Sequence, residues 1–406
     1  TENLSPNFTN QVCLKPLHFA GRIHPIRRSP SINSNTNGIG RRLLWDSRIG
    51  KIMIRDLCIT RQFEAILLLL GMQKKFTTQP PLFIHSADFD HPILHGLDEA
   101  EAVIDWSELE RLMSSIYGSK TGRPSYPLLT LFRALLLGIW YRLSDEQLAQ
   151  CLFRDLLFRK FCRLELDGSV PDGTTLGRFR AKLVEHDLWE LLLGEVNRQL
   201  EVKHIIITEG RVNIVDATAI EAAQSGSGKD KNDKPTKDAE AGWHVKADSR
   251  GRNKATYGFS VHTGVDEDGF IHRQTVTAGN VHDSRERDTL LLGDEAALYA
   301  DAAYSAQATR DVLERFGIED RVQRKGYRNQ PLSETDKARN AEIAVIRSTG
   351  ERPFATYKQH YGLARTRLMG LAKNLTLFGT AAIAHNIQKA AKFLRLYGVR
   401  EPLPAG

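Results

Sequence analysis

The sequence predicts a mixed α/β fold that is preceded by an all-helical amino-terminal part. Apolar residues recur at helical spacing from about residue 97 to residue 202. Apolar or alternating segments between residues 211 and 278 are typical of strands, and helical patterns return after residue 307. Because strands precede a run of helices in this second part, we expect one mixed sheet that is flanked by helices.

These patterns divide the chain into three ranges. We expect residues 72–203 to form the helical domain and residues 204–398 to form the α/β domain. Residues 1–71 are rich in Asn, Ser and Pro and show no sustained period, so we expect little packed structure there. Met72 is typical of a natural start; the preceding residues are then sequence upstream of the true reading frame, and the alternative is a disordered or DNA-binding arm.

The composition is that of an ordinary globular protein. Hydrophobic residues make up 41% of the 406 residues and charged residues 26%, which excludes disorder throughout the chain. Lys and Arg outnumber Asp and Glu by 56 to 49, and the resulting charge of +7 favours a polyanionic partner. Charge alone does not identify that partner, because many basic proteins never bind nucleic acid.

The cysteines and apolar runs indicate a protein of the cell interior. No pair of cysteines has the close spacing of a zinc site or a redox pair, so we interpret all of them as reduced thiols of the cytosol. The longest apolar run, Leu128 to Tyr141, is too short to span a bilayer and contains Arg133. We find no secretory signal, and the expected location is the cytoplasm. The cysteines are Cys13, Cys58, Cys151 and Cys162.

The helical part contains specific start and packing signals. Leu109, Leu112, Met113 and Ile116 are spaced to form one apolar helix face. Leu128 to Tyr141 predicts a strongly apolar helix. Ser144 and Gln147 then form a capping-box pattern, which predicts that a helix begins at Asp145 and continues to about Phe153.

A third helical stretch, residues 155–164, follows closely. Helix, short turn and helix with several basic residues nearby is typical of a helix-turn-helix-like DNA-binding module. The alternative is a helical bundle whose basic face is merely solvated. The basic residues are Arg142, Arg154, Arg159, Lys160 and Arg163.

The remaining elements are predicted as a series. One long helix is expected over residues 175–202, and residues 224–242 form a polar, low-complexity loop that we expect to be mobile and to pack no core. The predicted strands are residues 211–217, 255–266, 270–278 and 297–303. The predicted later helices are residues 307–316, 333–349 and 375–397.

Two aspartates stand where predicted apolar strands end. Asp216 follows VNIV and Asp301 follows ALYA. An ionised carboxylate in such a position is costly unless it is paired or binds a ligand. Two carboxylates supplemented by water and phosphate oxygens are a typical environment for Mg²⁺, so the pair indicates a metal site.

A third acid comes from a basic stretch further along the chain. Arg347, Glu351 and Lys358 are spaced to share one face of a continuous helix. Pro353 complicates this, because proline is tolerated in the first turn of a helix and kinks a helix interior. The alternative is an exposed Arg–Glu pair with no function.

At these residues the chain resembles the bacterial insertion-sequence transposases of the DDE class, most closely the insertion sequence 5 family. The resemblance covers about residues 76–390 and its motifs occur in the order of the family. They are GRPSYPLLTLFRALLLGIWYRLSDEQL, PDGTTLGRFR, VDATAIEA, YGFSVHTGVDEDGFI, GNVHDS, ADAAYS and GERPFATYKQHYGLARTR.

The resemblance implies an RNase H-like catalytic domain behind a helical DNA-binding domain. It implies that Asp216, Asp301 and Glu351 form the catalytic, metal-binding triad, with two Mg²⁺ ions per site that Mn²⁺ can replace. It also implies double-stranded DNA as the partner, namely the terminal inverted repeats and a target, bound by a homo-oligomer in the nucleoid. The implied reactions are strand cleavage and strand transfer.

The basic residues near the third acid are interpreted as contacts to the DNA backbone. We assign Arg347 and Lys358 to the flanking phosphate, and Arg365 and Arg367 to an extension of this track. Arg321, Arg324, Lys325 and Arg328 are further candidates. Any one of these side chains is more commonly just solvated.

Some residues depart from the family pattern or are left without a catalytic role. The tyrosine of the family's Tyr, Arg, Glu, Lys signature is replaced by Ala344, and a glycine usual in the second motif is replaced by Ala302 or Ala303. We expect His262 and His282 to be structural. Two other functions remain open on the sequence: a nuclease that does not transpose, and a decayed or domesticated DNA-binding protein.

Overall fold

The computed structural model describes residues 95–116, 125–208, 210–224, 237–247, 253–327 and 330–398. The amino-terminal range 1–71 therefore lies outside the described residues, and so do Cys13, Cys58 and Met72. Cys151 and Cys162 are free thiols, as predicted. No helix in the described ranges combines the length and the apolarity needed to cross a membrane.

The first half of the described chain is helical, as the periodicity predicted. Ser144 accepts a hydrogen bond from the backbone N–H of Gln147, and the Gln147 side chain accepts one from the Ser144 N–H, so the capping box is confirmed. The helices are α2 (Gly96–Ala102), α3 (Trp106–Met113), α4 (Leu128–Trp140), α5 (Asp145–Arg154), α6 (Leu156–Phe161), α7 (Gly173–Glu185) and α8 (Trp189–Val202).

The single long helix predicted over residues 175–202 is wrong. The helix α7 ends at Glu185 and α8 begins at Trp189. Between them Asp187 adopts a left-handed conformation with φ +48°, which stops a right-handed helix. Polar His186 and Asp187 interrupt the apolar pattern at this turn, and that interruption was the sequence signal that the prediction overlooked.

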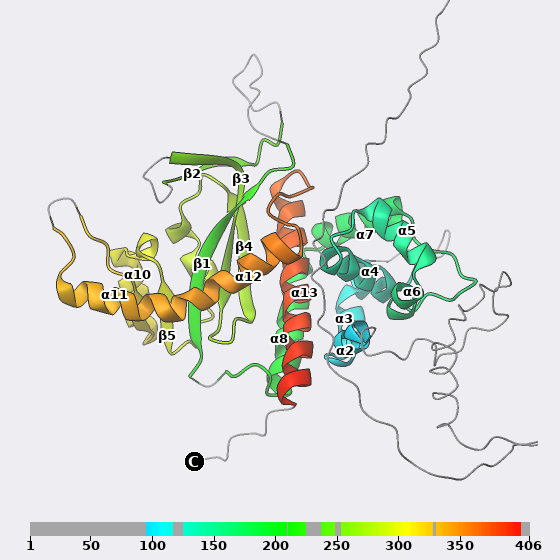
Figure 1. The fold of residues 1–406 in the computed structure, drawn as a ribbon, viewed down its shortest axis with the longest axis horizontal. Coiled ribbons are helices and arrows are strands. Elements are labelled where there is room, and N and C mark those ends of the chain that lie inside the picture. Colours follow the sequence, from blue (N-terminus) through cyan, green and yellow to red (C-terminus); the bar gives the residue numbers. More distant parts are fainter. Residues whose placement is uncertain are drawn as a thin grey trace, which may run out of the picture. The chain divides into compact units, whose positions relative to one another are not determined.

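The second half contains one mixed sheet (Figure 1). Its order is β2-β3-β1-β5-β6; β1 and β3 are antiparallel, whereas β1, β5 and β6 run parallel. Strand β4 pairs with β3 next to β2, because β3 is long enough for both. The strands are β1 (Val212–Glu221), β2 (Gly242–Ala247), β3 (Asn253–Val265), β4 (Ile271–Ala278), β5 (Ala297–Ala300) and β6 (Glu319–Val322).

Helices cover both faces of this sheet and divide its core in two. One cluster joins Val215, Leu298 and Ala300 on one face to Leu313 of α10. The opposite face, which includes Ile214 and Tyr299, joins the larger cluster that continues into α8, α13 and the amino-terminal helices. The helices of this half are α9 (Arg287–Leu290), α10 (Gln307–Phe316), α11 (Glu334–Arg347), α12 (Glu351–Ala355) and α13 (Leu371–Tyr397).

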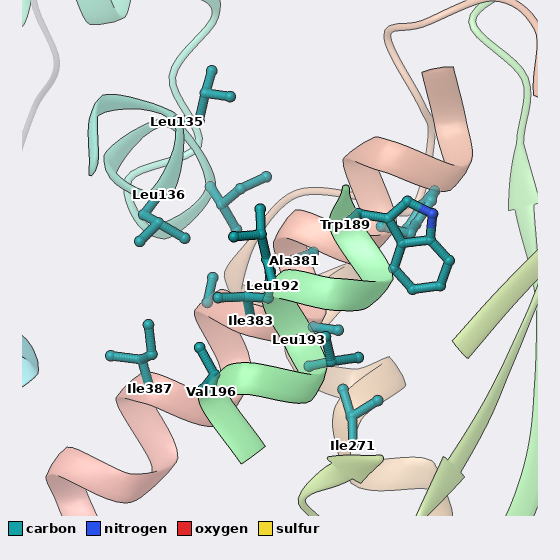
Figure 2. Packing of buried hydrophobic residues seen from close by; sticks show 14 of the residues in the cluster. Leu135, Leu136, Trp189, Leu192, Leu193, Val196, Ile271, Ala381, Ile383 and Ile387 are labelled. Atoms are coloured by element: carbon teal, nitrogen blue, oxygen red, sulfur yellow. The ribbon is translucent and has the colours of Figure 1, made fainter. Parts of the chain in front are cut away.

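Helices α8 and α13 connect the sheet to the helical part. Figure 2 shows Leu192, Leu193 and Val196 of α8 packed with Ile383 and Ile387 of α13, near Ile271 of β4. A buried polar side chain stabilises the same junction by hydrogen bonds. The Asn386 amide group donates to the Ile271 carbonyl at 2.8 Å and accepts from its N–H at 3.0 Å, so the helix is hydrogen-bonded to β4.

Two strands and one packed segment were missed by the sequence analysis. Strands β2 and β6 are short and largely polar, so neither carries the apolar run that marked the others. The predicted loop 224–242 is described only from residue 237 at its carboxyl end, and there it packs. Asp238 is buried, its carbonyl accepts from Tyr257 Oη at 2.6 Å, and its carboxylate accepts from the Gly370 N–H at 2.9 Å.

Candidate active site

The sheet opens at the point where Asp216 lies. Strand β5 pairs with β1 only along Val212–Ile214, so the edge of β1 beyond Ile214 has lost this neighbour. Asp216 lies two residues past Ile214, and Asp301 directly follows β5. Because β1 and β5 are parallel and Ile214 pairs with Tyr299, the two aspartates lie level with each other. Only β5 ends there; β1 continues to Glu221, so the prediction that a strand ends at Asp216 is wrong.

Each aspartate is fixed by a backbone hydrogen bond. Asp216 Oδ1 accepts from the Ala217 N–H at 3.0 Å. Asp301 Oδ1 accepts from the Ala303 N–H at 2.8 Å, which caps a 3-10 turn over Ala302–Tyr304. One oxygen of each carboxylate is thereby oriented by the chain, and the other is left for a further partner.

Glu351 is carried by a continuous helical segment that changes its winding. Helix α11 runs into a 3-10 turn, Ser348–Gly350, and then into α12. Pro353 is tolerated because it lies in the first turn of α12. Gly350 faces β1 so closely that an added Cβ would lie 3.0 Å from Ile214 Cγ2 and 3.6 Å from Asp216 Cβ. The lack of a side chain at this position therefore lets Glu351 approach Asp216.

The three acids line one cleft of about 810 Å³. Arg347 and Lys358 line it as well, as the helical spacing predicted. The other lining residues come mostly from β1, β2 and the end of β4. They include Thr218, Trp243, His244, Lys254, Asn280, His282, Asp283 and Phe354.

Arg347 lies between two of the acids. Its Nη1 is 3.8 Å from Asp301 Oδ2 and its Nη2 is 3.6 Å from Glu351 Oε1. These separations exceed hydrogen-bond length, and among the described residues Nη1 has no hydrogen-bond partner. The guanidinium is therefore a partly buried cation whose Nη1 donors are still unused.

The electrostatics connect all three acids to one another. Burial raises the pKa of Asp216 to about 6, although the charge of Arg347 and the hydrogen bond from Ala217 lower it. The charges of Asp301 and Glu351 raise the pKa of Asp216 further, so both acids lie within electrostatic range. A strongly raised carboxylate pKa in a cleft is typical of a functional site.

Lys358 is held against the first strand. Its Nζ donates to Thr218 Oγ1 at 2.5 Å from a π-helical turn, Thr356–His360. Such a turn widens the helix, and turns of this kind are common at functional sites. The ammonium group is thus fixed at the wall of the cleft.

Arg365 and Arg367 do not line this cleft. Arg365 donates to the carbonyls of Ala222 and Ala223, at 3.0 and 2.9 Å, and so ties its loop to the end of β1. Arg367 donates to the Arg142 carbonyl at 3.1 Å. The interpretation of both as DNA contacts thus competes with a structural role that the sequence analysis did not foresee.

Some of the further basic candidates for DNA contact form ion pairs within the chain. Arg321 pairs with Glu319 at 2.5 Å and Arg324 with Asp320 at 3.6 Å, whereas Lys325 is exposed. Arg328 lies outside the described residues.

The predicted basic face of the helical part needs a correction at Arg159. This residue is 5% exposed, and its Nη2 donates to the carbonyls of Glu165, Leu166 and Gly168. It therefore closes a loop and is not available on the surface. Lys160 pairs with Asp98 at 2.8 Å and Arg163 pairs with Glu101, while Arg154 stays exposed.

Sequence reasoning missed several cleft residues. Trp243, His244 and Lys254 belong to β2 and its partner strand, and β2 was not predicted. Asn280 and Asp283 belong to the GNVHDS motif, which was recognised but given no catalytic role. His282 hydrogen-bonds Ser284 Oγ at 2.8 Å, in agreement with the structural role expected for it.

The chemistry of the cleft fits a hard divalent cation. Its candidate ligands are carboxylate oxygens, and a bound cation would stabilise the charged form of Asp216, which burial and, to a smaller extent, the charges of Asp301 and Glu351 disfavour. Within the described ranges, no three His, Cys, Asp or Glu side chains are already gathered at metal-ligand distance. The Glu351 side chain is 66% exposed, so a rotation of this side chain suffices to change its distance from the aspartates.

Comparison with known families identifies the class of protein. A family model described as "Transposase DDE domain" matches residues 207–387, and one described as "Transposase domain (DUF772)" matches residues 88–182. No solved structure matches the chain. The two family matches together cover more than half of the chain, and they define an enzyme of metal-dependent DNA cleavage and strand transfer. Residues 207–387 are thus a DDE transposase domain.

Proposed function

We propose that this transposase belongs to the insertion sequence 5 family and acts on the terminal inverted repeats of its own element. In this proposal, strand cleavage and strand transfer take place in one cleft by two-metal phosphoryl transfer. The observation that carries the proposal is that acids from three separate segments, Asp216, Asp301 and Glu351, line the same cleft, and that the pKa of Asp216 responds to both of the others.

The three acids, Asp216, Asp301 and Glu351, would hold the divalent ions. Mg²⁺ is the expected ion, and Mn²⁺ would replace it. A pair of bound ions activates the attacking oxygen and stabilises the leaving oxygen of the phosphodiester. Asp301 and Glu351 would complete the set of carboxylate ligands. Since water and a 3′-hydroxyl attack phosphorus in the same in-line manner, one arrangement of acids serves both reactions.

Two of the cations that line the cleft, Arg347 and Lys358, would hold the DNA strand. Arg347 offers unused donors next to the acids, which suits a bidentate contact to a phosphate. Lys358 lies at the wall near Thr218 and would contact a neighbouring phosphate. We also propose that the amino-terminal helices bind DNA and that the enzyme acts as a homo-oligomer in the nucleoid. The basic pI and the exposed Arg154 support the first of these points.

The deciding experiment compares the full chain with Asp216→Asn on DNA that carries the inverted repeats flanking its gene. With Mg²⁺ or Mn²⁺ present, the unchanged chain should cut the ends and join them to a plasmid. The loss of one carboxylate ligand should lower cleavage by about 1,000-fold, since metal ions contribute several kcal/mol to such transition states. Asp311→Asn, an exposed acid of α10, is the matched control and should cut normally.

Two outcomes separate the competing functions. Cleavage without joined products would indicate a nuclease rather than a transposase. Equal cutting by the unchanged chain and by Asp216→Asn would refute the carboxylate site, and binding of the repeats without any cutting would indicate a decayed DNA-binding protein.

A further inference from the structure

Asp283 is a fourth acid of the same cleft. It lies in the wall formed after β4, together with Asn280 and His282. Asp283 starts a short 3-10 turn, Asp283–Arg285, and this turn contacts the 3-10 turn Ala302–Tyr304 that Asp301 caps. The segment that follows β4 thereby brings another carboxylate into the cleft, on a turn that contacts the turn capped by the second triad residue.

A buried histidine lies behind this acid with an unused ring nitrogen. His262 of β3 is 0% exposed, and its Nε2 is 2.9 Å from Thr277 Oγ1. Its Nδ1 has no hydrogen-bond partner among the described residues and lies 3.8 Å from Asp283 Oδ1. Burial lowers the pKa of His262 to about 4, with a further lowering by His244, so the ring is neutral near pH 7. If Nε2 accepts from Thr277, the hydrogen on Nδ1 points toward the acid.

A second buried donor lies on the same side. Tyr304 is 1% exposed, and its hydroxyl has no hydrogen-bond partner among the described residues. Burial raises the pKa of Tyr304, and the charges of Asp283, Asp216 and Asp301 raise it further, in that order. Leaving a buried polar atom without a partner costs about 1–3 kcal/mol. One such atom lies 3.8 Å from Asp283 Oδ1 and the other belongs to a residue within electrostatic range of the same acid, and together they indicate a site that is completed only when a ligand is bound.

We infer that Asp283, oriented by His262, is an outer carboxylate that binds the water molecules around the divalent cation of this cleft. This inference rests on the proposed function, because it assumes that Asp216 and its partners hold that cation. Mg²⁺ loses its water shell reluctantly, so a carboxylate that accepts hydrogen bonds from coordinated water helps to retain it. Such outer partners typically contribute about 10–100-fold to metal affinity.

The test is Mn²⁺ binding to the purified full chain, measured by electron paramagnetic resonance, together with thermal unfolding without metal. Asp283→Asn should weaken Mn²⁺ binding about tenfold and leave the unfolding temperature unchanged. Asp216→Asn, which removes a proposed direct ligand, should weaken it far more. Asp311→Asn removes the same charge outside the cleft and should bind Mn²⁺ normally.

Two replacements of His262 separate positioning from simple packing. Asn places its amide nitrogen near the position of Nδ1, whereas Gln places its own near Nε2. His262→Gln should therefore weaken Mn²⁺ binding as Asp283→Asn does, and His262→Asn should retain more of it. In the Asp283→Asn background, His262→Gln should cause no additional loss, because the two residues act through one contact.

The outcomes are distinguishable. Normal Mn²⁺ binding by Asp283→Asn, with weakened binding by Asp216→Asn, would overturn the inference and leave the proposed function intact. Normal binding by both variants would overturn the two together. Equal losses in His262→Gln and His262→Asn, each with a lower unfolding temperature, would show that His262 only packs the core and would refute its positioning role.

Discussion

Arg159 of the helical part and Arg347 of the cleft are both largely buried arginines, but their surroundings differ. Arg159 directs one nitrogen at three backbone carbonyls of its own loop. Arg347 faces the carboxylates of Asp301 and Glu351 from beyond hydrogen-bond distance. A buried charge alone therefore does not indicate a functional site. A buried charge indicates a functional site when it has unused hydrogen-bond donors and lies in a cleft together with acidic side chains.

Matched substitutions at these two arginines give the largest expected effects. Arg347→Met should lower DNA cleavage about 100-fold, the usual result of removing one donor to a charged transition state. Its free energy of unfolding should change by only about 1 kcal/mol, because the removed donors include one without a partner. Cleavage of the inverted-repeat duplex and urea unfolding measure the two quantities.

Arg159→Met should show the reverse pattern. Methionine keeps the apolar packing and removes the donor to three carbonyls, so unfolding should become easier by about 3 kcal/mol. At a temperature where the variant is folded, its cleavage rate should match that of the unchanged chain. If Arg159→Met instead weakened DNA binding with no loss of stability, the comparison would fail and Arg159 would return to the DNA surface.

The same distinction limits what the sequence could predict about the site. An acid that follows a run of apolar strand residues is unusual in any context, and this pattern selected Asp216 and Asp301 as candidates, although β1 continues past Asp216 to Glu221. The spacing of Arg347, Glu351 and Lys358 predicted one face of a continuous helix; the segment instead contains a 3-10 and a π-helical turn, but the three residues do line one cleft. The sequence does not reveal which basic side chains donate hydrogen bonds to backbone carbonyls and so have a structural role. Arg159, Arg365 and Arg367 have the same sequence character as Arg347, and only the three-dimensional contacts distinguish them.

The fold was predictable to a similar extent. Elements with a strong period or a start signal were correct, as with α4 and the capping box of α5. Strands β2 and β6 were missed because pairing with β3 and β5, rather than an apolar pattern, defines them. The break between α7 and α8 was missed because it depends on the left-handed conformation of Asp187. The local sequence pattern specifies neither the partner of a strand nor the backbone conformation of a single residue.

The raised pKa of Asp216 makes the stability of the folded chain depend on pH. Its pKa is raised from 3.8 to about 6 in the folded chain, so the folded state binds the proton more tightly than the unfolded state does. The associated stability is fully present below pH 4 and is lost as the pH rises through 6. In Asp216→Asn this loss is absent, so the variant should gain about 2–3 kcal/mol relative to the unchanged chain between pH 4 and pH 8.

Thermal unfolding in a metal chelator at both pH values checks this prediction. If the difference in stability between the two chains does not change with pH, Asp216 has an ordinary pKa in the folded chain. Added Mn²⁺ should narrow the difference at pH 8, since only the unchanged chain has the full ligand set.

Arg365 should give the smallest effect and tests the boundary between the two kinds of arginine. Its side chain is 50% exposed, and it donates to the carbonyls of Ala222 and Ala223. Arg365→Met should lower the free energy of unfolding by about 1 kcal/mol, the net value of such hydrogen bonds. If its role is only structural, the slope of DNA affinity against salt concentration should stay the same. A decrease of about one unit in that slope would instead assign Arg365 to a phosphate, as the sequence predicted, because each phosphate contact releases about one counterion.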